Sequence, residues 1–132
     1  MSGATRATGR CACGAIRYEV TAPLRDVVNC HCERCRRVTG HFMAAGQVRD
    51  DALVVTDSGA VAWWEAAPGV RYGFCPICGS TLFWRAGARG LTSIAAGTLD
   101  PPTGLTTTTA WYVADASDYH RLDPGLVQHR HE

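Results

Sequence analysis

The chain has 132 residues, of which 46% are hydrophobic and 19% charged, as is typical of an ordinary soluble globular protein. Its formal net charge of +1 gives no case for nucleic-acid binding, and no apolar run approaches the roughly 20 residues of a membrane helix. All 13 basic residues are arginine, which excludes a lysine nucleophile or Schiff base and suggests a GC-rich, bacterial genome.

The N-terminal stretch MSGATRATGR lacks the apolar segment of a signal peptide. We therefore expect a cytoplasmic protein, in which thiols stay reduced and clustered cysteines bind metal or act chemically. The composition predicts one domain over residues 1–132, with a loose N-terminus at 1–8 and a solvated tail at 128–132.

Short apolar or alternating runs separated by turn residues predict a mainly β domain. The predicted strands are Cys13–Val20, Asp26–Cys30, Phe42–Val48, Leu53–Thr56, Ala60–Glu65, Val70–Phe74, Thr81–Trp84, Thr92–Ala96 and Thr107–Val113. Pro68-Gly69 indicates a hairpin turn, and one short helix is predicted at Glu33–Thr39, ended by Gly40.

The seven cysteines fall into three short motifs, and their odd number excludes a complete disulfide framework. The segment FCPICGS is typical of a zinc knuckle that supplies Cys75 and Cys78, after which Gly79 permits a tight bend. Cys11 and Cys13, as alternate residues of an extended strand, would point to the same face and could complete a closed four-cysteine site.

The remaining motif, CHCERC, leaves Cys30, Cys32 and Cys35 as three ligands with no fourth cysteine. Three protein ligands and one exchangeable position are typical of a catalytic zinc site. Two alternatives stay open: Cys32 and Cys35 could instead join the knuckle, or His31 or His41 could close the second site.

The ordered set CACGAIRY, CHCERCRRVTG, FCPICGSTL, AAGTLD and YVADASDYHRLDPGL resembles the glutathione-dependent formaldehyde-activating enzyme family, which includes centromere protein V-like domains. The resemblance covers roughly residues 9 to 128. It implies a β-tent fold, with mostly antiparallel sheets around two zinc ions.

The family assigns its first and last cysteine pairs to a structural zinc, here Cys11, Cys13, Cys75 and Cys78. It assigns the central triplet to a catalytic zinc, here Cys30, Cys32 and Cys35. One departure is Ala110, which stands where family members often carry a histidine and could change the substrate.

The resemblance implies a carbon–sulfur lyase, similar to S-(hydroxymethyl)glutathione synthase, that acts on glutathione or an analogous thiol and formaldehyde. Arg36 and Arg37, next to the triplet, are candidates for binding the carboxylates of the thiol. Two other functions stay open: a non-catalytic zinc module that anchors a partner through Trp63 or Trp64, and a thiol redox or metal-handling protein.

Overall fold

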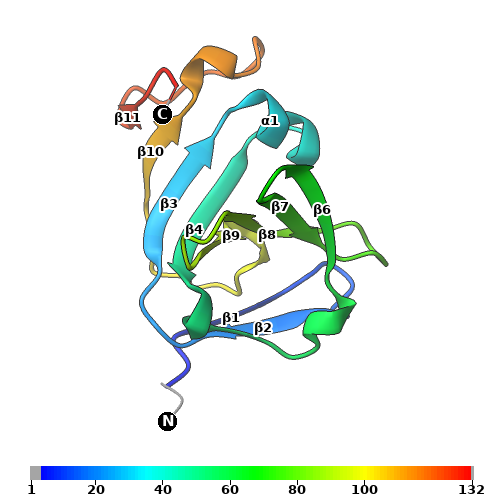
Figure 1. Ribbon diagram of the computed structural model, residues 1–132. Helices are drawn as coiled ribbons and strands as arrows, with labels where there is room; N and C mark the ends of the chain where they lie inside the picture. Colours follow the sequence, from blue (N-terminus) through cyan, green and yellow to red (C-terminus); the bar gives the residue numbers. More distant parts are fainter. Residues whose placement is uncertain (1–3, 132) are drawn as a thin grey trace.

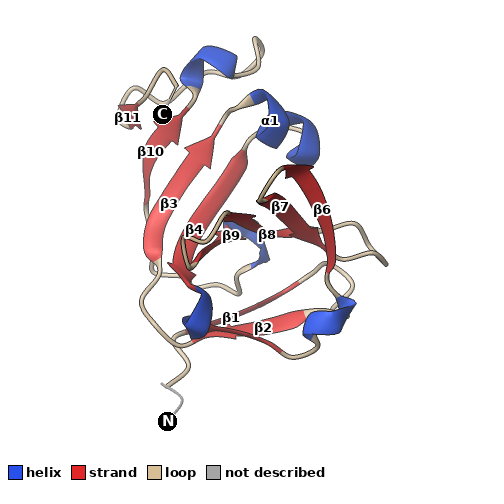
Figure 2. Ribbon diagram, viewed as in Figure 1, coloured by secondary structure: helices blue, strands red, loops and turns tan. Residues whose placement is uncertain are grey.

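The structure is a computed structural model that describes residues 4–131, so residues 1–3 of the predicted loose N-terminus and residue 132 of the predicted tail lie outside it. One α-helix, α1 (Glu33–Thr39), accompanies the strands (Figures 1 and 2). The strands are β1 (Ala7–Arg10), β2 (Arg17–Val20), β3 (Arg25–Cys30), β4 (Met43–Arg49), β5 (Leu53–Val55), β6 (Ala62–Ala67), β7 (Val70–Phe74), β8 (Thr81–Ala86), β9 (Leu91–Ala95), β10 (Thr107–Trp111) and β11 (Val127–Gln128). Four short 3-10 turns lie at Asp50–Ala52, Ser58–Ala60, Ala96–Thr98 and Val113–Asp115.

The strands form two sheets. A three-stranded sheet has the order β1-β2-β5, and an eight-stranded sheet has the order β11-β10-β3-β4-β9-β8-β7-β6. The larger sheet bends strongly over the smaller one, so that β3 and β4 face one side while β6 and β7 stand across from them (Figure 1). All pairings are antiparallel except those of β10 with β3 and with β11.

The mainly β fold expected from the sequence is confirmed. The short helix has the predicted bounds, and Gly40 ends it in the left-handed conformation, with its N–H donating to the Arg36 carbonyl. Pro68-Gly69 connects β6 and β7 as predicted, since Ala67 pairs with Val70.

Two expectations need correction and a third gains detail. Residues 7 and 8 of the predicted loose N-terminus belong to β1, which pairs with β2. Residues 128, 130 and 131 of the predicted solvated tail are exposed, and backbone bonds hold this segment to the β10 end, for example from the Tyr112 N–H to the His131 carbonyl at 2.7 Å. The predicted strand Cys13–Val20 begins only at Arg17, because the preceding residues form a turn in which the Gly14 N–H donates to the Cys11 carbonyl at 3.1 Å.

The two faces of the larger sheet have different roles. One face packs on the small sheet around a core that includes Tyr18, Leu82, Phe83 and Ile94. The buried Tyr18 hydroxyl has a hydrogen-bond partner in the Thr98 hydroxyl, at 2.7 Å. The other face carries a second, smaller apolar cluster that includes Cys35, with Cys30 and Cys32 packed against it, and this cluster positions the site described below.

Among residues 4–131, no helix has the length and apolar character needed to span a bilayer. Trp64, one of the two tryptophans suggested as an anchor for a partner, is 49% exposed. Trp63 instead packs against the core and has the guanidinium groups of Arg71 and Arg85 about 5 Å from its ring.

Candidate metal centres

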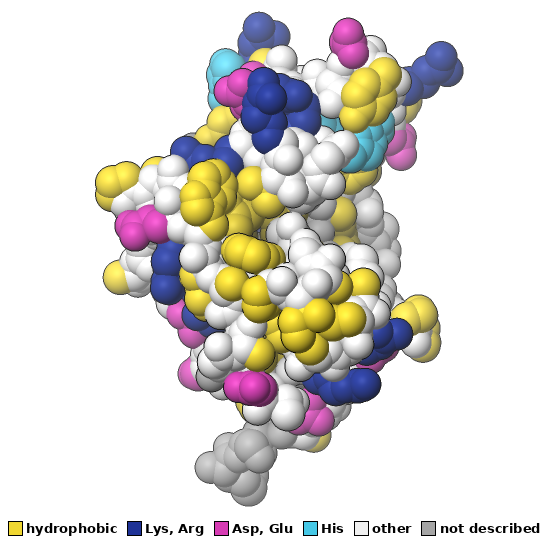
Figure 3. All heavy atoms as spheres, turned by 90° about the vertical axis from the view of Figure 1, so that its right-hand side faces the viewer, with side chains coloured by type: hydrophobic (Ala, Val, Ile, Leu, Met, Phe, Trp, Pro, Cys, Tyr) yellow, Lys and Arg dark blue, Asp and Glu magenta, His cyan; other side chains and the backbone are white. Residues whose placement is uncertain are grey.

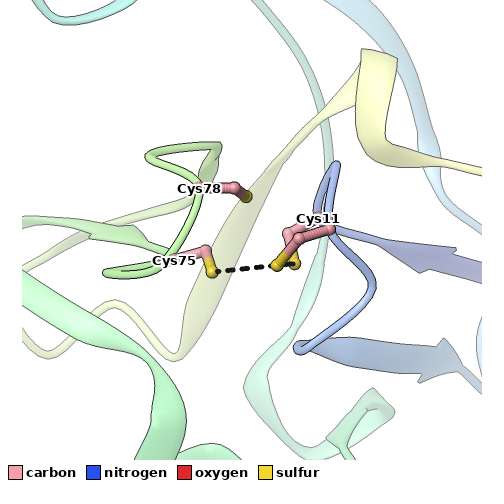
Figure 4. Close-up of side chains that lie close together, drawn as sticks. Cys11, Cys75 and Cys78 are labelled. Atoms are coloured by element: carbon pink, nitrogen blue, oxygen red, sulfur yellow. Dashed lines mark hydrogen bonds between the residues drawn. The ribbon is translucent and has the colours of Figure 1, made fainter.

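The first cysteine cluster joins two turns that are far apart in the sequence. Cys11 and Cys13 lie in the turn between β1 and β2, whereas Cys75 and Cys78 lie in the turn between β7 and β8 (Figure 4). The four sulfur atoms lie within 4.8 Å of one another, with 3.6 Å between Cys11 and Cys13 and 3.8 Å between Cys13 and Cys75. A tetrahedral metal ion with thiolate bonds of about 2.3 Å holds its sulfurs roughly 3.8 Å apart, so this cluster could hold a metal ion.

Main-chain and hydroxyl contacts fix the shape of this cluster. Gly79 has a φ of 80° and donates its N–H to the Cys75 carbonyl at 2.7 Å, which closes the predicted knuckle. The Ser80 hydroxyl accepts from the Ala12 N–H at 2.9 Å and lies 3.2 Å from the Cys78 sulfur. Its hydrogen bond is the largest contribution that lowers the pKa of Cys78, to about 5. Ser80 therefore links the two turns and favours a thiolate.

The second cluster is local in sequence. Cys30 ends β3, Cys32 is the N-cap of α1, and Cys35 lies in the first turn of the helix. Their sulfurs lie within 4.8 Å of one another, so they too could hold a metal ion. The cysteines of the competing partition, Cys32 and Cys35 with the knuckle pair, fall in separate clusters.

The Cys32 sulfur is the best-stabilised anion of this triplet. It accepts the N–H of Cys35 at 3.3 Å, in the manner of a helix cap. Hydrogen bonds from Cys30 and Cys35 lower the pKa of Cys32 to about 2. The same hydrogen bond to Cys32 raises the pKa of Cys30 to about 11. These opposite shifts favour the ionised form at Cys32 and the protonated form at Cys30.

Tyr72 of β7 is a neighbour of the triplet that the sequence did not indicate. Its hydroxyl lies 3.1 Å from the Cys35 sulfur, and its side chain is only 2% exposed. Burial, followed by the hydrogen bond with Cys35, raises the pKa of Tyr72, so the hydroxyl keeps its proton and can donate it to a Cys35 thiolate. The two residues are 37 positions apart, so no local pattern could have connected them.

Neither histidine considered as a fourth ligand joins the triplet. His31 is 2% exposed and its ring stacks with that of His120 at a centroid distance of 5.3 Å. His41 lies next to Phe42, and its Nδ1 is 3.2 Å from the Tyr119 hydroxyl. Among residues 4–131, no histidine or carboxylate forms one group with the three sulfurs.

A cleft of about 680 Å³ opens beside the triplet, with all three cysteines in its lining. The larger sheet contributes alternate residues of β4, namely Met43, Ala45 and Gln47, which share one face because side chains alternate along a strand. The four-cysteine cluster, by contrast, has none of its residues in this lining. The triplet is therefore the cysteine cluster that borders a cleft large enough to hold a small molecule.

The arginines predicted to bind a substrate occupy different places. Arg37 lines the cleft and pairs with Glu33 at 3.4 Å, whereas Arg36 does not line it. Basic side chains gather at the upper end of the molecule, the end that carries α1 (Figure 3). Three further arginines line the cleft: Arg34 of α1, Arg25 at the start of β3, and Arg89 between β8 and β9.

Ala110, the departure from the family pattern, is 1% exposed in β10 and pairs with Asn29 of β3. It does not line the cleft, although the two aromatic residues that follow it, Trp111 and Tyr112, do. Tyr112 has a φ of 56°, an uncommon value for a residue with a bulky side chain, and it ends the strand two residues earlier than predicted.

Comparisons with known proteins agree with the motif order. The model of the family described as glutathione-dependent formaldehyde-activating enzyme matches residues 6–115. A protein of Halomonas elongata, which carries the provisional name of such an enzyme, is 34% identical over 84 residues. That match covers 57% of this chain and 53% of the relative, so the chain spans about half the length of the curated relative.

The fold also matches a solved structure. A crystal structure of a Rhodobacter sphaeroides protein superposes with a TM-score of 0.62, covering 92% of this chain and 98% of that one. The two chains are 20% identical, so the likeness concerns the fold alone.

Proposed function

We propose an activity for this chain, which belongs to the glutathione-dependent formaldehyde-activating enzyme family. The chain is a zinc-dependent enzyme that joins a thiol to formaldehyde and cleaves the adduct. The observation that carries the proposal is the cysteine triplet beside the cleft. The triplet supplies three thiolate ligands, and residues 4–131 supply no fourth ligand to it. A small molecule has access to it through the cleft. These features suit an open metal site.

The donor set fits zinc at both clusters. Cys11, Cys13, Cys75 and Cys78 would hold a structural ion, since four sulfur ligands complete a tetrahedral site. Cys30, Cys32 and Cys35 would hold the catalytic ion. Zinc there would supply an open position that a soft ligand such as a thiol sulfur prefers, and would keep that sulfur deprotonated.

The proposed reaction is a simple addition. The thiol sulfur attacks the carbonyl carbon of formaldehyde and forms a C–S bond, and the π electrons of the carbonyl move to its oxygen. The proton given up by the thiol ends on that oxygen, so the product is the S-(hydroxymethyl) thiol. The reverse direction breaks the C–S bond, which is the chemistry of a carbon–sulfur lyase.

The residues of this chain would act by positioning. The cleft would hold two small reactants next to each other. Most of the acceleration would arise because the entropy of bringing them together is lost on binding and not in the reaction step. Tyr72 would hold Cys35 in place, while Arg37 remains a candidate for contact with the thiol. Arg36 is the weaker candidate because it does not line the cleft. All seven cysteines lie in the two clusters that could hold a metal ion, an arrangement that suits a reducing, cytoplasmic setting.

The test is the rate at which the adduct of glutathione and formaldehyde forms, followed by exchange NMR. We expect zinc-loaded protein to accelerate formation at least tenfold over the spontaneous rate, and Cys32→Ser to remove the acceleration. A rate equal to that of the protein-free mixture would contradict the proposal. The accompanying measurement is zinc content during a graded chelator titration, in which one of two ions should be labile and respond to added thiol.

A further inference from the structure

The eight-stranded sheet ends at β6, and this edge is open. β6 pairs with β7 on one side, and among residues 4–131 no other strand pairs with it. Figure 1 shows β6 on the right-hand side of the molecule, away from β10 and β11. β6 has six residues, whereas β11 at the other end of the sheet has two. The main-chain groups of β6 that point away from β7 are a template for a further strand.

An exposed tryptophan lies on this open edge. Trp64 stacks on Tyr72 with 6.0 Å between ring centroids, yet it remains 49% exposed. Beside it lies a hollow of about 330 Å³, with Val38 and Phe74 also in its lining. Hydrophobic side chains gather across the middle of the face that Figure 3 shows, which is the side that carries β6. An exposed aromatic side chain beside an apolar hollow is typical of a protein–protein contact.

The opposite face of the same edge carries charges of both signs. Trp63 and Glu65 share this face because side chains alternate along a strand. The guanidinium carbon of Arg71 lies 4.9 Å from the centroid of the Trp63 ring. Arg71 and Glu65 are both exposed, and neither forms an ion pair with a described residue. The edge therefore presents a cation at Trp63 and an anion at Glu65, two residues further along the strand.

A second copy of the chain fits this charge pattern in one register. When a twofold axis relates two antiparallel strands, it passes beside one residue, which then lies opposite its own copy. An axis at Trp63 would bring two Arg71 side chains together, and an axis at Glu65 would oppose two carboxylates. Like charges directly opposite each other destabilise a sheet. An axis at Trp64 instead places Glu65 of each copy opposite Trp63 of the other, next to Arg71.

The same register suits the apolar face and the backbone. It places the two Trp64 side chains directly opposite each other, with Cβ atoms about 5 Å apart, beside the two hollows. Residues 62–65 keep a regular register with β7, and the shift in pairing comes only between Glu65 and Ala67. The segment that carries the charges and the tryptophans is therefore regular strand.

We propose that this chain forms a twofold dimer in which β6 pairs antiparallel with β6 of a second copy, about an axis at Trp64. The two eight-stranded sheets then join into one, and each Glu65 pairs with Arg71 of the other copy. No residue of β6 lines the cleft beside the cysteine triplet, so the dimer is independent of the proposed function.

The test is sedimentation velocity of the metal-loaded protein in reducing buffer over a range of concentrations. We expect a monomer–dimer equilibrium with a dissociation constant of about 10–100 μM, as for other small interfaces. Glu65→Arg and Arg71→Glu each oppose like charges across the axis and should weaken dimerisation at least about tenfold. In an equal mixture of the two variants the opposite charges face each other again. Dimerisation should therefore return in the mixture, which also shows that both variants are folded.

A matched control is Glu19→Arg, which reverses an exposed charge on β2 of the small sheet and should leave the dissociation constant unchanged. Trp64→Ser should weaken dimerisation without any change of charge. A dimer that resists Glu65→Arg, or that responds equally to Glu19→Arg, would overturn the proposal. A mixture of Glu65→Arg and Arg71→Glu that stays monomeric would also overturn it. A parent protein that is monomeric at every concentration would overturn it too and would leave the β6 edge to a different protein.

Discussion

The two cysteine clusters use the same ligand atom but differ in how the chain supplies it. The four-cysteine cluster draws Cys11 and Cys75, both fully buried, from turns that are more than 60 residues apart in sequence. The triplet comes from one β3–α1 segment of six residues and borders a cleft. A metal ion at the first cluster would therefore cross-link distant segments of the chain. A metal ion at the second cluster would bind within one continuous segment and would cross-link no distant ones.

This difference separates stability from reactivity. A metal ion that cross-links distant segments contributes its binding free energy to folding. A metal ion held by a local segment contributes less to the global fold and can keep a ligand position open. The burial of the cysteines does not follow this division, since each turn of the four-cysteine cluster provides one buried and one exposed cysteine.

The largest expected effect is that of Cys78→Ser. Cys78 is exposed, so the change leaves no unsatisfied hydroxyl in the core, and any loss of stability reports on the site itself. We expect the melting temperature of the metal-loaded protein to fall by more than about 10 °C, or cooperative folding to be lost, because the site stabilises the fold by several kcal/mol. Circular dichroism melting measures this, and a melting curve like that of the parent would remove the structural role.

Cys32→Ser, at the triplet, should reduce activity strongly and stability only slightly. The bound metal should fall by one ion per chain and adduct formation should fall to the spontaneous rate, a loss of at least about tenfold, because a ligand and the best-stabilised thiolate are lost together. The melting temperature should change by only about 3 °C or less. Metal analysis, the exchange rate and a melting curve are compared on one preparation. A large loss of stability here would mean that the two clusters do not divide their roles.

Acidification should empty the triplet. Cys30, whose pKa is raised to about 11, and Cys35, whose pKa is also raised by its hydrogen bonds with Cys30 and Cys32, must lose protons to bind a metal ion. Metal affinity therefore rises with pH and falls as pH decreases, by about tenfold per pH unit for each proton displaced. Competition with a chelator at several pH values between 6 and 8 gives the slope. A flat profile would show that the thiols are already ionised without metal.

Tyr72→Phe should have the smallest effect. Removing the hydroxyl 3.1 Å from the Cys35 sulfur should weaken metal binding at the triplet about tenfold, at the lower end of the range for groups that support metal ligands. The four-cysteine site should be unaffected. The matched control is Tyr18→Phe, which removes another buried hydroxyl, bonded to Thr98 and away from the triplet. If both variants shift the metal affinity equally, the Tyr72 contact has no specific role.

Local patterns in the sequence were sufficient for much of the fold. The helix at Glu33–Thr39 has a glycine stop, the β6–β7 hairpin has a Pro-Gly turn, and the cysteine motifs set the positions of sulfurs within each turn. Errors arose where local signals were weak. Residues of β1 and β11 form short strands that exist only because a neighbouring strand pairs with them.

The amino-acid sequence alone therefore determined the family, the mainly β architecture and the supply of thiolates, because these depend on spacing and turn chemistry within a few residues. The tertiary structure alone decided that the Tyr72 hydroxyl meets Cys35, that Arg25 and Arg89 line one cleft, and that Arg36 does not line it. Such contacts depend on strand register and on how the sheet bends. Both are set by packing over the whole molecule, so they leave no signature at the residues they bring together.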